Sequence, residues 1–144
     1  MRFLSCWGKF RATEIICYSS LFAEFGYRDL NFCGWQITPG LFDLVDVPDL
    51  QGLIAPRPLL VDIGSRDECF RLESAMECYR RVERIYQMAG AGANLELDLH
   101  SGGHTWGGTK RKRFFASIWG GLSCLRRNDQ SCFHTITTNK FIIL

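Results

Sequence analysis

One strand–helix–strand pattern in the middle of the chain restricts its fold more than any other feature. Residues 59–63 form an apolar run that ends at Gly64, which is typical of a buried strand. Residues 72–89 repeat apolar side chains every three or four positions, which predicts an amphipathic helix that Gly90 caps. Leucines alternate with acidic residues over 95–99, the period of a strand with one wetter face. This order predicts two parallel strands joined by a crossover helix.

Shorter elements flank this unit. A further short buried strand is expected over residues 14–18. Asp46 is a suitable cap for a short helix that carries Pro48 in its first turn and that later prolines stop. A last helix is expected over residues 109–119, before Gly120-Gly121. It would bury Phe114, Phe115 and Ile118. We therefore predict an α/β fold of about three parallel strands with packed helices.

The composition is that of an ordinary globular chain. Of 144 residues, 47% are hydrophobic and 22% are charged, which suffices for one domain with a core. The net charge of +2 gives no reason to expect a nucleic-acid partner. No apolar run approaches the roughly 18 residues of a membrane span, and the N-terminus has too short an apolar core for a signal peptide. The seven cysteines include no C-x-x-C pair, so a reducing, cytoplasmic setting is expected.

Two loops carry groups used in acid–base chemistry. Asp67 ends the loop 64–67 after one central strand, and His104 ends the loop 101–104 after the other. Functional loops of a parallel sheet lie at the carboxyl ends of its strands, so both loops lie at one edge. Neighbouring strands are about 4.8 Å apart, which would bring Asp67 and His104 within hydrogen-bonding distance. A carboxylate beside an imidazole fixes its tautomer and stabilises the imidazolium that forms when the ring takes a proton.

Five runs of sequence, in this order, carry a resemblance to one enzyme family. They are Arg28-Asp29-Leu30-Asn31-Phe32-Cys33-Gly34, Asp46-Val47-Pro48-Asp49-Leu50, Leu53-Ile54-Ala55-Pro56-Arg57-Pro58-Leu59-Leu60-Val61, Gly64-Ser65-Arg66-Asp67 and Gly102-Gly103-His104. From about residue 13 to 119 the chain resembles the C-terminal part of an α/β-hydrolase, in the esterase branch that includes dienelactone-hydrolase-like and acetyl-xylan-esterase-like enzymes. The resemblance implies a partial α/β-hydrolase fold over residues 1–121, with Asp67 as triad acid and His104 as triad base. Residues 122–144 form a C-terminal extension without assignment.

The nucleophile of such a triad is missing from the sequence. The family order implies a serine in a G-x-S-x-G elbow ahead of the acid and the base, and neither G-x-S-x-G nor G-x-C-x-G occurs. Ser19 and Ser20 lack the small neighbours that an elbow needs, and Ser117 follows the histidine on an expected helix. The oxyanion hole is expected to be missing as well. We therefore expect a truncated carboxylic ester hydrolase, inactive by itself, that would act on a small ester if completed and needs no cofactor.

Two alternatives stay open. A non-catalytic binding or assembly module would keep the half-fold and form a homo-oligomer through the sheet edge that the missing strands leave exposed. A peptidase of the same superfamily would differ only in its substrate pocket.

Three smaller patterns receive a structural interpretation. His100 and His104 are four positions apart, but the residues between them disfavour a helix and no cysteine or carboxylate completes a ligand set, so no metal is expected. Cys33 is interpreted as a packing residue. Residues 110–113 are interpreted as the solvated face of the last helix.

Overall fold

The computed structural model describes residues 11–24, 38–41, 43–118 and 142–143. Within these residues one parallel sheet has the strand order β3-β2-β1-β4. The strands are β1 (Thr13–Ile16), β2 (Leu59–Gly64), β3 (Leu95–His100) and β4 (Ile142–Ile143). The helices are α2 (Val47–Gly52), α3 (Leu72–Met88), the short 3-10 helix η3 (Gly92–Asn94) and α4 (Arg111–Ile118). The predicted α/β fold, with three consecutive parallel strands and interleaved helices, is confirmed.

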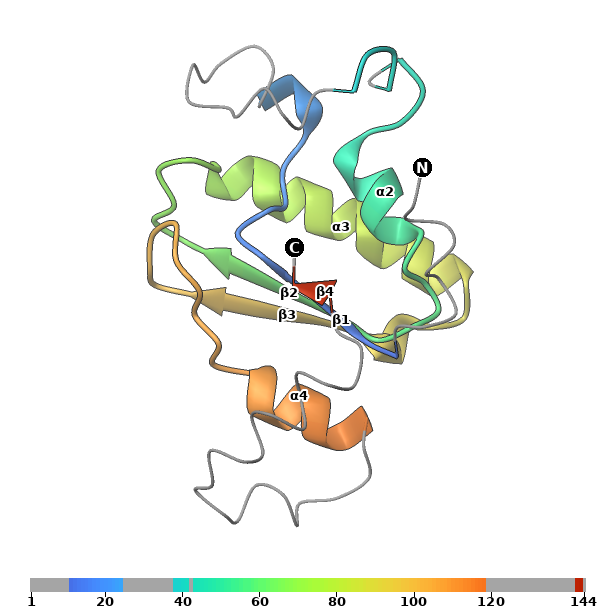
Figure 1. Ribbon diagram of the computed structural model, residues 1–144, viewed down its shortest axis with the longest axis vertical. Coiled ribbons are helices and arrows are strands. Elements are labelled where there is room, and N and C mark those ends of the chain that lie inside the picture. Colours follow the sequence, from blue (N-terminus) through green and yellow to red (C-terminus); the bar gives the residue numbers. More distant parts are fainter. Residues whose placement is uncertain (1–10, 25–37, 42, 119–141, 144) are drawn as a thin grey trace.

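Helices cover both faces of this sheet. Helices α2 and α3 lie on one side of it and α4 lies on the other (Figure 1). Strand β2 contributes to both layers because its side chains alternate: Val61 packs in the cluster on the α3 side, and Leu60 packs with Phe114 and Phe115 of α4. Every residue of β2 is buried, which explains why its sequence is apolar except for Asp62.

Local signals explain most of the element ends. The carboxylate of Asp46 caps α2, and Asp49 accepts a hydrogen bond from the backbone N–H of Asp46 at 2.8 Å, which completes a capping box. Helix α3 ends at Met88, and Gly90 follows with φ +66°, the left-handed conformation expected after a helix. Strand β1 is shorter than predicted, because Cys17 turns the chain away with φ +48°.

The face of β3 that was predicted to be wetter is covered over much of its length, although the Glu96 side chain stays 28% exposed. Asp98 is fully buried and accepts hydrogen bonds from the hydroxyl of Thr109 and, at 2.7 Å, from the backbone N–H of Lys110. These donors lie just before α4, so the chain that leads into α4 covers the face that was expected to meet solvent. Leu99 faces the other way and is 47% exposed.

The basic start of α4 is only partly a solvated face. The side chain of Arg111 is 17% exposed and pairs with Glu14 of β1 at 3.3 Å. Its guanidinium lies 4.6 Å from the centre of the Trp106 ring. Glu14 is itself buried, and this burial raises its pKa although Trp106 and Arg111 both favour the charged form. Arg111 is therefore drawn inward by a buried carboxylate, which the local sequence pattern did not indicate.

The C-terminal extension contributes β4. Ile142 and Ile143 pair in parallel with Thr13 and Glu14 of β1, and so cover part of the edge that the assembly interpretation leaves exposed. The rest of the extension, Gly120-Gly121 and the run 28–34 with Cys33 lie outside the described residues. No described helix is both long enough and apolar enough to cross a membrane.

Candidate active site

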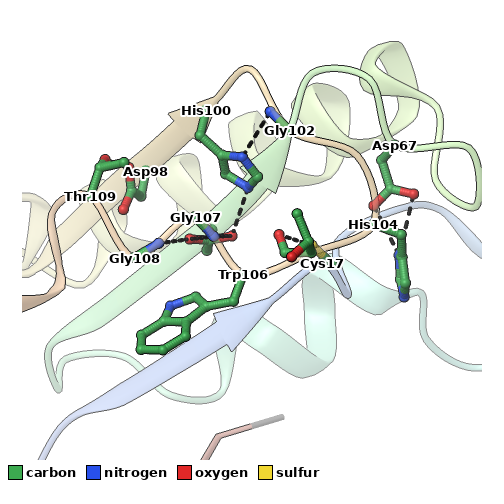
Figure 2. A network of polar contacts seen from close by, with 12 residues as sticks. Cys17, Asp67, Asp98, His100, Gly102, His104, Trp106, Gly107, Gly108 and Thr109 are labelled. Carbon is green, nitrogen blue, oxygen red and sulfur yellow. Dashed lines mark hydrogen bonds and ion pairs between the residues drawn. The ribbon is translucent and has the colours of Figure 1, made fainter.

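Asp67 and His104 meet at the carboxyl edge of the sheet. Strands β2 and β3 are adjacent and parallel, and Gly64 pairs with His100 where both strands end. The two loops therefore leave the sheet at the same level. The Nδ1 atom of His104 lies 3.0 Å from Oδ2 and 3.2 Å from Oδ1 of Asp67 (Figure 2). The structure thus brings together the two residues that the sequence placed at one edge.

Backbone hydrogen bonds hold the two loops against each other. The N–H groups of residues 65 and 66 donate to the carbonyls of His100 and Gly102, at 2.8 and 3.0 Å. This contact requires glycine at the end of β2, because a Cβ atom at Gly64 would lie 2.2 Å from the carbonyl oxygen of Gly103. The separation of the acid from the base is therefore set by a close backbone approach.

The Asp67 carboxylate is shielded and fixed in orientation. Its side chain is 2% exposed. Oδ1 accepts hydrogen bonds from the backbone N–H groups of Cys69 and Phe70, at 2.8 and 3.1 Å. These two donors hold one oxygen and turn the other toward His104, which is what an orienting carboxylate needs.

The imidazole of His104 is half-exposed, at 48%. Its ring leans on that of Phe70, with centroids 5.4 Å apart. Because an ionised carboxylate only accepts hydrogen bonds, the proton of the neutral ring lies on Nδ1 and Nε2 is left as an acceptor. Within the described residues, Nε2 makes no hydrogen bond. The ring can therefore take a proton from an incoming group on its solvent side.

A second histidine–aspartate pair lies nearby, but it supports the fold. His100 Nε2 lies 3.1 Å from Asp62 Oδ1, and both side chains are buried. The other ring nitrogen of His100 accepts the backbone N–H of Gly102 at 3.0 Å. Asp62 also accepts the N–H groups of Gly107 and Gly108, at 3.1 and 3.0 Å. The pair thus pins the loop that carries His104 onto the end of β2.

The serines considered from sequence do not supply a nucleophile. Ser19 and Ser20 are buried, and their hydroxyls bond to Gln51 at 3.3 Å and to Ser74 at 2.8 Å. Ser117 lies on α4, where its hydroxyl donates to the carbonyl of Phe114 at 2.7 Å. All three hydroxyls are engaged away from His104.

Cys17 belongs to this site, although the sequence pattern did not single it out. It directly follows β1, and its φ of +48° is uncommon for any residue except glycine. Its Sγ donates to the carbonyl of Thr105 at 3.2 Å. Sγ, a carboxylate oxygen of Asp67 and a ring nitrogen of His104 all lie within 4.8 Å of one another. The strand predicted over residues 14–18 placed Cys17 inside the strand, so the sequence carried no signal that this residue lies at the carboxyl edge.

The thiol of Cys17 is not activated. Burial, then the negative charges of Asp67 and Asp62, raise its pKa to about 11. A thiol of this kind is neutral near pH 7 and is a poor nucleophile. Moreover, the Nδ1 atom of His104 is engaged by Asp67 at 3.0 Å.

Comparison with known protein families, with curated proteins and with solved structures finds no match for this chain. The chemistry of the site is therefore argued from its geometry.

Proposed function

We propose that the chain carries the acid–base half of an ester hydrolase site, with His104 as general base and Asp67 as the residue that orients it. The observation that supports this is the contact of 3.0 Å between Nδ1 of His104 and Oδ2 of Asp67, on a ring that is 48% exposed and whose Nε2 makes no hydrogen bond within the described residues. Nε2 would take a proton from the attacking water molecule and return it to the leaving alcohol, while Asp67 stabilises the imidazolium between the two steps. The resemblance to the esterase branch of the α/β-hydrolases favours the same roles and a small carboxylic ester as substrate.

The proposal includes no covalent serine step on this chain. No G-x-S-x-G elbow occurs in the 144 residues, and the serines named above are engaged elsewhere. Water is therefore the nucleophile available to His104, and an activated ester is the substrate it can serve. We expect no turnover of unactivated esters by the isolated chain, because a triad without its nucleophile keeps only weak residual catalysis.

Hydrolysis of p-nitrophenyl acetate tests this proposal, in the presence of a chelator. His104→Ala should lower the rate by about tenfold or more, since a positioned base contributes at least that much. Asp67→Asn should lower it as well, because an amide neither fixes the tautomer nor stabilises the imidazolium. Glu68→Gln, an exposed neighbour, serves as the matched control and should leave the rate unchanged. Equal rates for the wild type and folded His104→Ala would refute the proposal.

A binding or assembly module is the second candidate, supported by the part of β1 that has no strand partner on its outer side within the described residues, although the Ile15 side chain is itself buried. Strand β4 pairs with Thr13 and Glu14 only, so within the described residues Ile15 and Ile16 have no strand partner on that side. Such a segment invites pairing with another chain. Light scattering after size exclusion decides the matter: this candidate requires a multiple of the 16.5 kDa chain mass, and a monomer at all concentrations would contradict it.

A reducing, cytoplasmic setting is proposed together with either function. The odd number of cysteines supports it, and so does the presence of Cys17 and Cys78 as thiols in the core.

A further inference from the structure

We propose that Cys17, Asp67 and His104 bind one divalent transition-metal ion, with zinc as the expected ion. Sulfur, carboxylate oxygen and imidazole nitrogen together are a donor set that zinc prefers. The expectation of no metal rested on the residues between His100 and His104, which disfavour a helix, and on the lack of a cysteine or carboxylate in the sequence pattern to complete a ligand set. In the folded chain, Cys17 and Asp67 lie beside His104 and complete a ligand set that the sequence pattern did not reveal.

The three ligands come from rigid positions. Cys17 follows β1, and the loops of Asp67 and His104 follow β2 and β3, so the ligands lie at one end of three adjacent strands (Figure 2). Zinc bonds of about 2.0 to 2.3 Å in tetrahedral geometry place ligand atoms roughly 3.5 Å apart. The Asp67 and His104 atoms are 3.0 Å apart, and Sγ of Cys17 lies within 4.8 Å of its two partners. Small side-chain rotations are therefore enough to close the site around an ion.

Secondary contacts already orient two of the ligands. The N–H groups of Cys69 and Phe70 hold one oxygen of Asp67 and leave the other for the ion. The N–H of Cys17 donates to the carbonyl of Asp62 at 3.0 Å, which fixes the backbone of that ligand. The side chain of His104 is 48% exposed, so solvent reaches the ring that would bind the ion.

The charge around Cys17 favours a cation. The Asp67 carboxylate belongs to the same cluster as Sγ of Cys17, and a divalent ion between the two would offset the negative charge that they carry as ligands. The alternative set of Cys17, Asp62 and His100 does not fit, although its atoms are equally close. Both ring nitrogens of His100 hold hydrogen bonds that the loop needs.

Metal binding also bears on the proposed catalysis. An ion on Nδ1 leaves the proton of the neutral ring on Nε2, so His104 ceases to be a base. Zinc should therefore inhibit ester hydrolysis. This one consequence rests on the proposed function, whereas the metal site itself does not.

Titration of the reduced, full-length chain with cobalt(II) tests the site. We expect a thiolate-to-cobalt charge-transfer band and the ligand-field bands of a tetrahedral ion, saturating at one equivalent and bleached by zinc. Cys17→Ser should abolish the charge-transfer band. Cys78→Ser, at another buried cysteine, is the matched control and should keep it. His104→Ala, at a half-exposed side chain, should weaken binding by at least about tenfold.

The outcomes separate this proposal from the proposed function. Absence of tetrahedral bands in the wild type, or an unchanged charge-transfer band in folded Cys17→Ser, would overturn the metal site. Neither result affects the ester assay, because the chelator in that assay keeps the chain free of metal. Conversely, if Asp67 and His104 do not catalyse ester hydrolysis, the cobalt spectrum still tests the metal site by itself.

Discussion

Replacing Gly64 by alanine tests the claim that a close backbone approach sets the acid–base distance. The new Cβ would lie 2.2 Å from the carbonyl oxygen of Gly103 and 2.8 Å from that of Gly102. Both atoms are backbone and belong to the loop that carries His104. No flexible side chain can yield, so the two loops must separate.

The expected cost follows from two contributions. Overpacking a filled, buried position costs about 1 to 3 kcal/mol. Separation of the loops also weakens the hydrogen bonds from the N–H groups of residues 65 and 66, which are worth about 1 kcal/mol each. A loss of about 2 to 4 kcal/mol in unfolding free energy is expected, if part of these bonds survives. At roughly 3 °C per kcal/mol for a domain of this size, the Tm should fall by about 6 to 12 °C.

Thermal and urea unfolding followed by circular dichroism measure this loss. Gly92→Ala is the matched control, because its added Cβ would meet only the side chain of Gln87, at an ordinary 3.9 Å. Its unfolding free energy should stay within about 0.5 kcal/mol of wild type, as for most surface substitutions. Gly64→Ala with the stability of Gly92→Ala would refute the argument that backbone contact fixes the loops.

Further predictions concern the buried groups beneath the loops. Asp62→Asn weakens the hydrogen bonds that the carboxylate accepts from His100, Gly107 and Gly108, and should cost about 1 to 3 kcal/mol in urea unfolding. Asp43→Asn, at an exposed position, should cost little. In metal-free protein at pH 8, about one Cys17 thiol in a thousand is ionised, because its pKa is about 11. Iodoacetamide should therefore label the exposed Cys69 far faster than Cys17. Equal labelling rates of the two cysteines, measured by mass spectrometry, would contradict the argument that burial keeps Cys17 neutral. The pKa of Cys17 is higher in the folded state than in the unfolded state, so folding favours the neutral thiol. The stability that this difference contributes should be fully present below about pH 9 and should be lost as the pH rises through about 11. The difference in Tm between wild type and Cys17→Ala should shrink over that interval.

The parts of the fold that could be predicted are those in which local pattern and burial agree. Strand β2 is buried along its whole length, and α3 follows with one apolar stripe. The order of these elements leaves few topologies, and a parallel arrangement puts both loops at one edge. Asp67 and His104 could be paired for that reason, without knowledge of a single contact.

The parts that could not be predicted depend on contacts between distant segments. Asp98 is buried because residues just before α4 supply its donors, and alternation along β3 cannot show this. Strand β4 is two residues long, too short for any period. Cys17 joins the site through its place beside β2 and its positive φ, neither of which its neighbours in sequence specify.

The tautomer of His104 tests the central claim most directly. Long-range proton–nitrogen NMR of the metal-free chain, in the presence of a chelator, distinguishes a protonated from an unprotonated ring nitrogen. The contact with Asp67 predicts that the neutral ring carries its proton on Nδ1 and leaves Nε2 unprotonated, and that Asp67→Asn removes this preference. A neutral ring protonated mainly on Nε2 in the wild type would contradict the assignment of His104 as a carboxylate-oriented base.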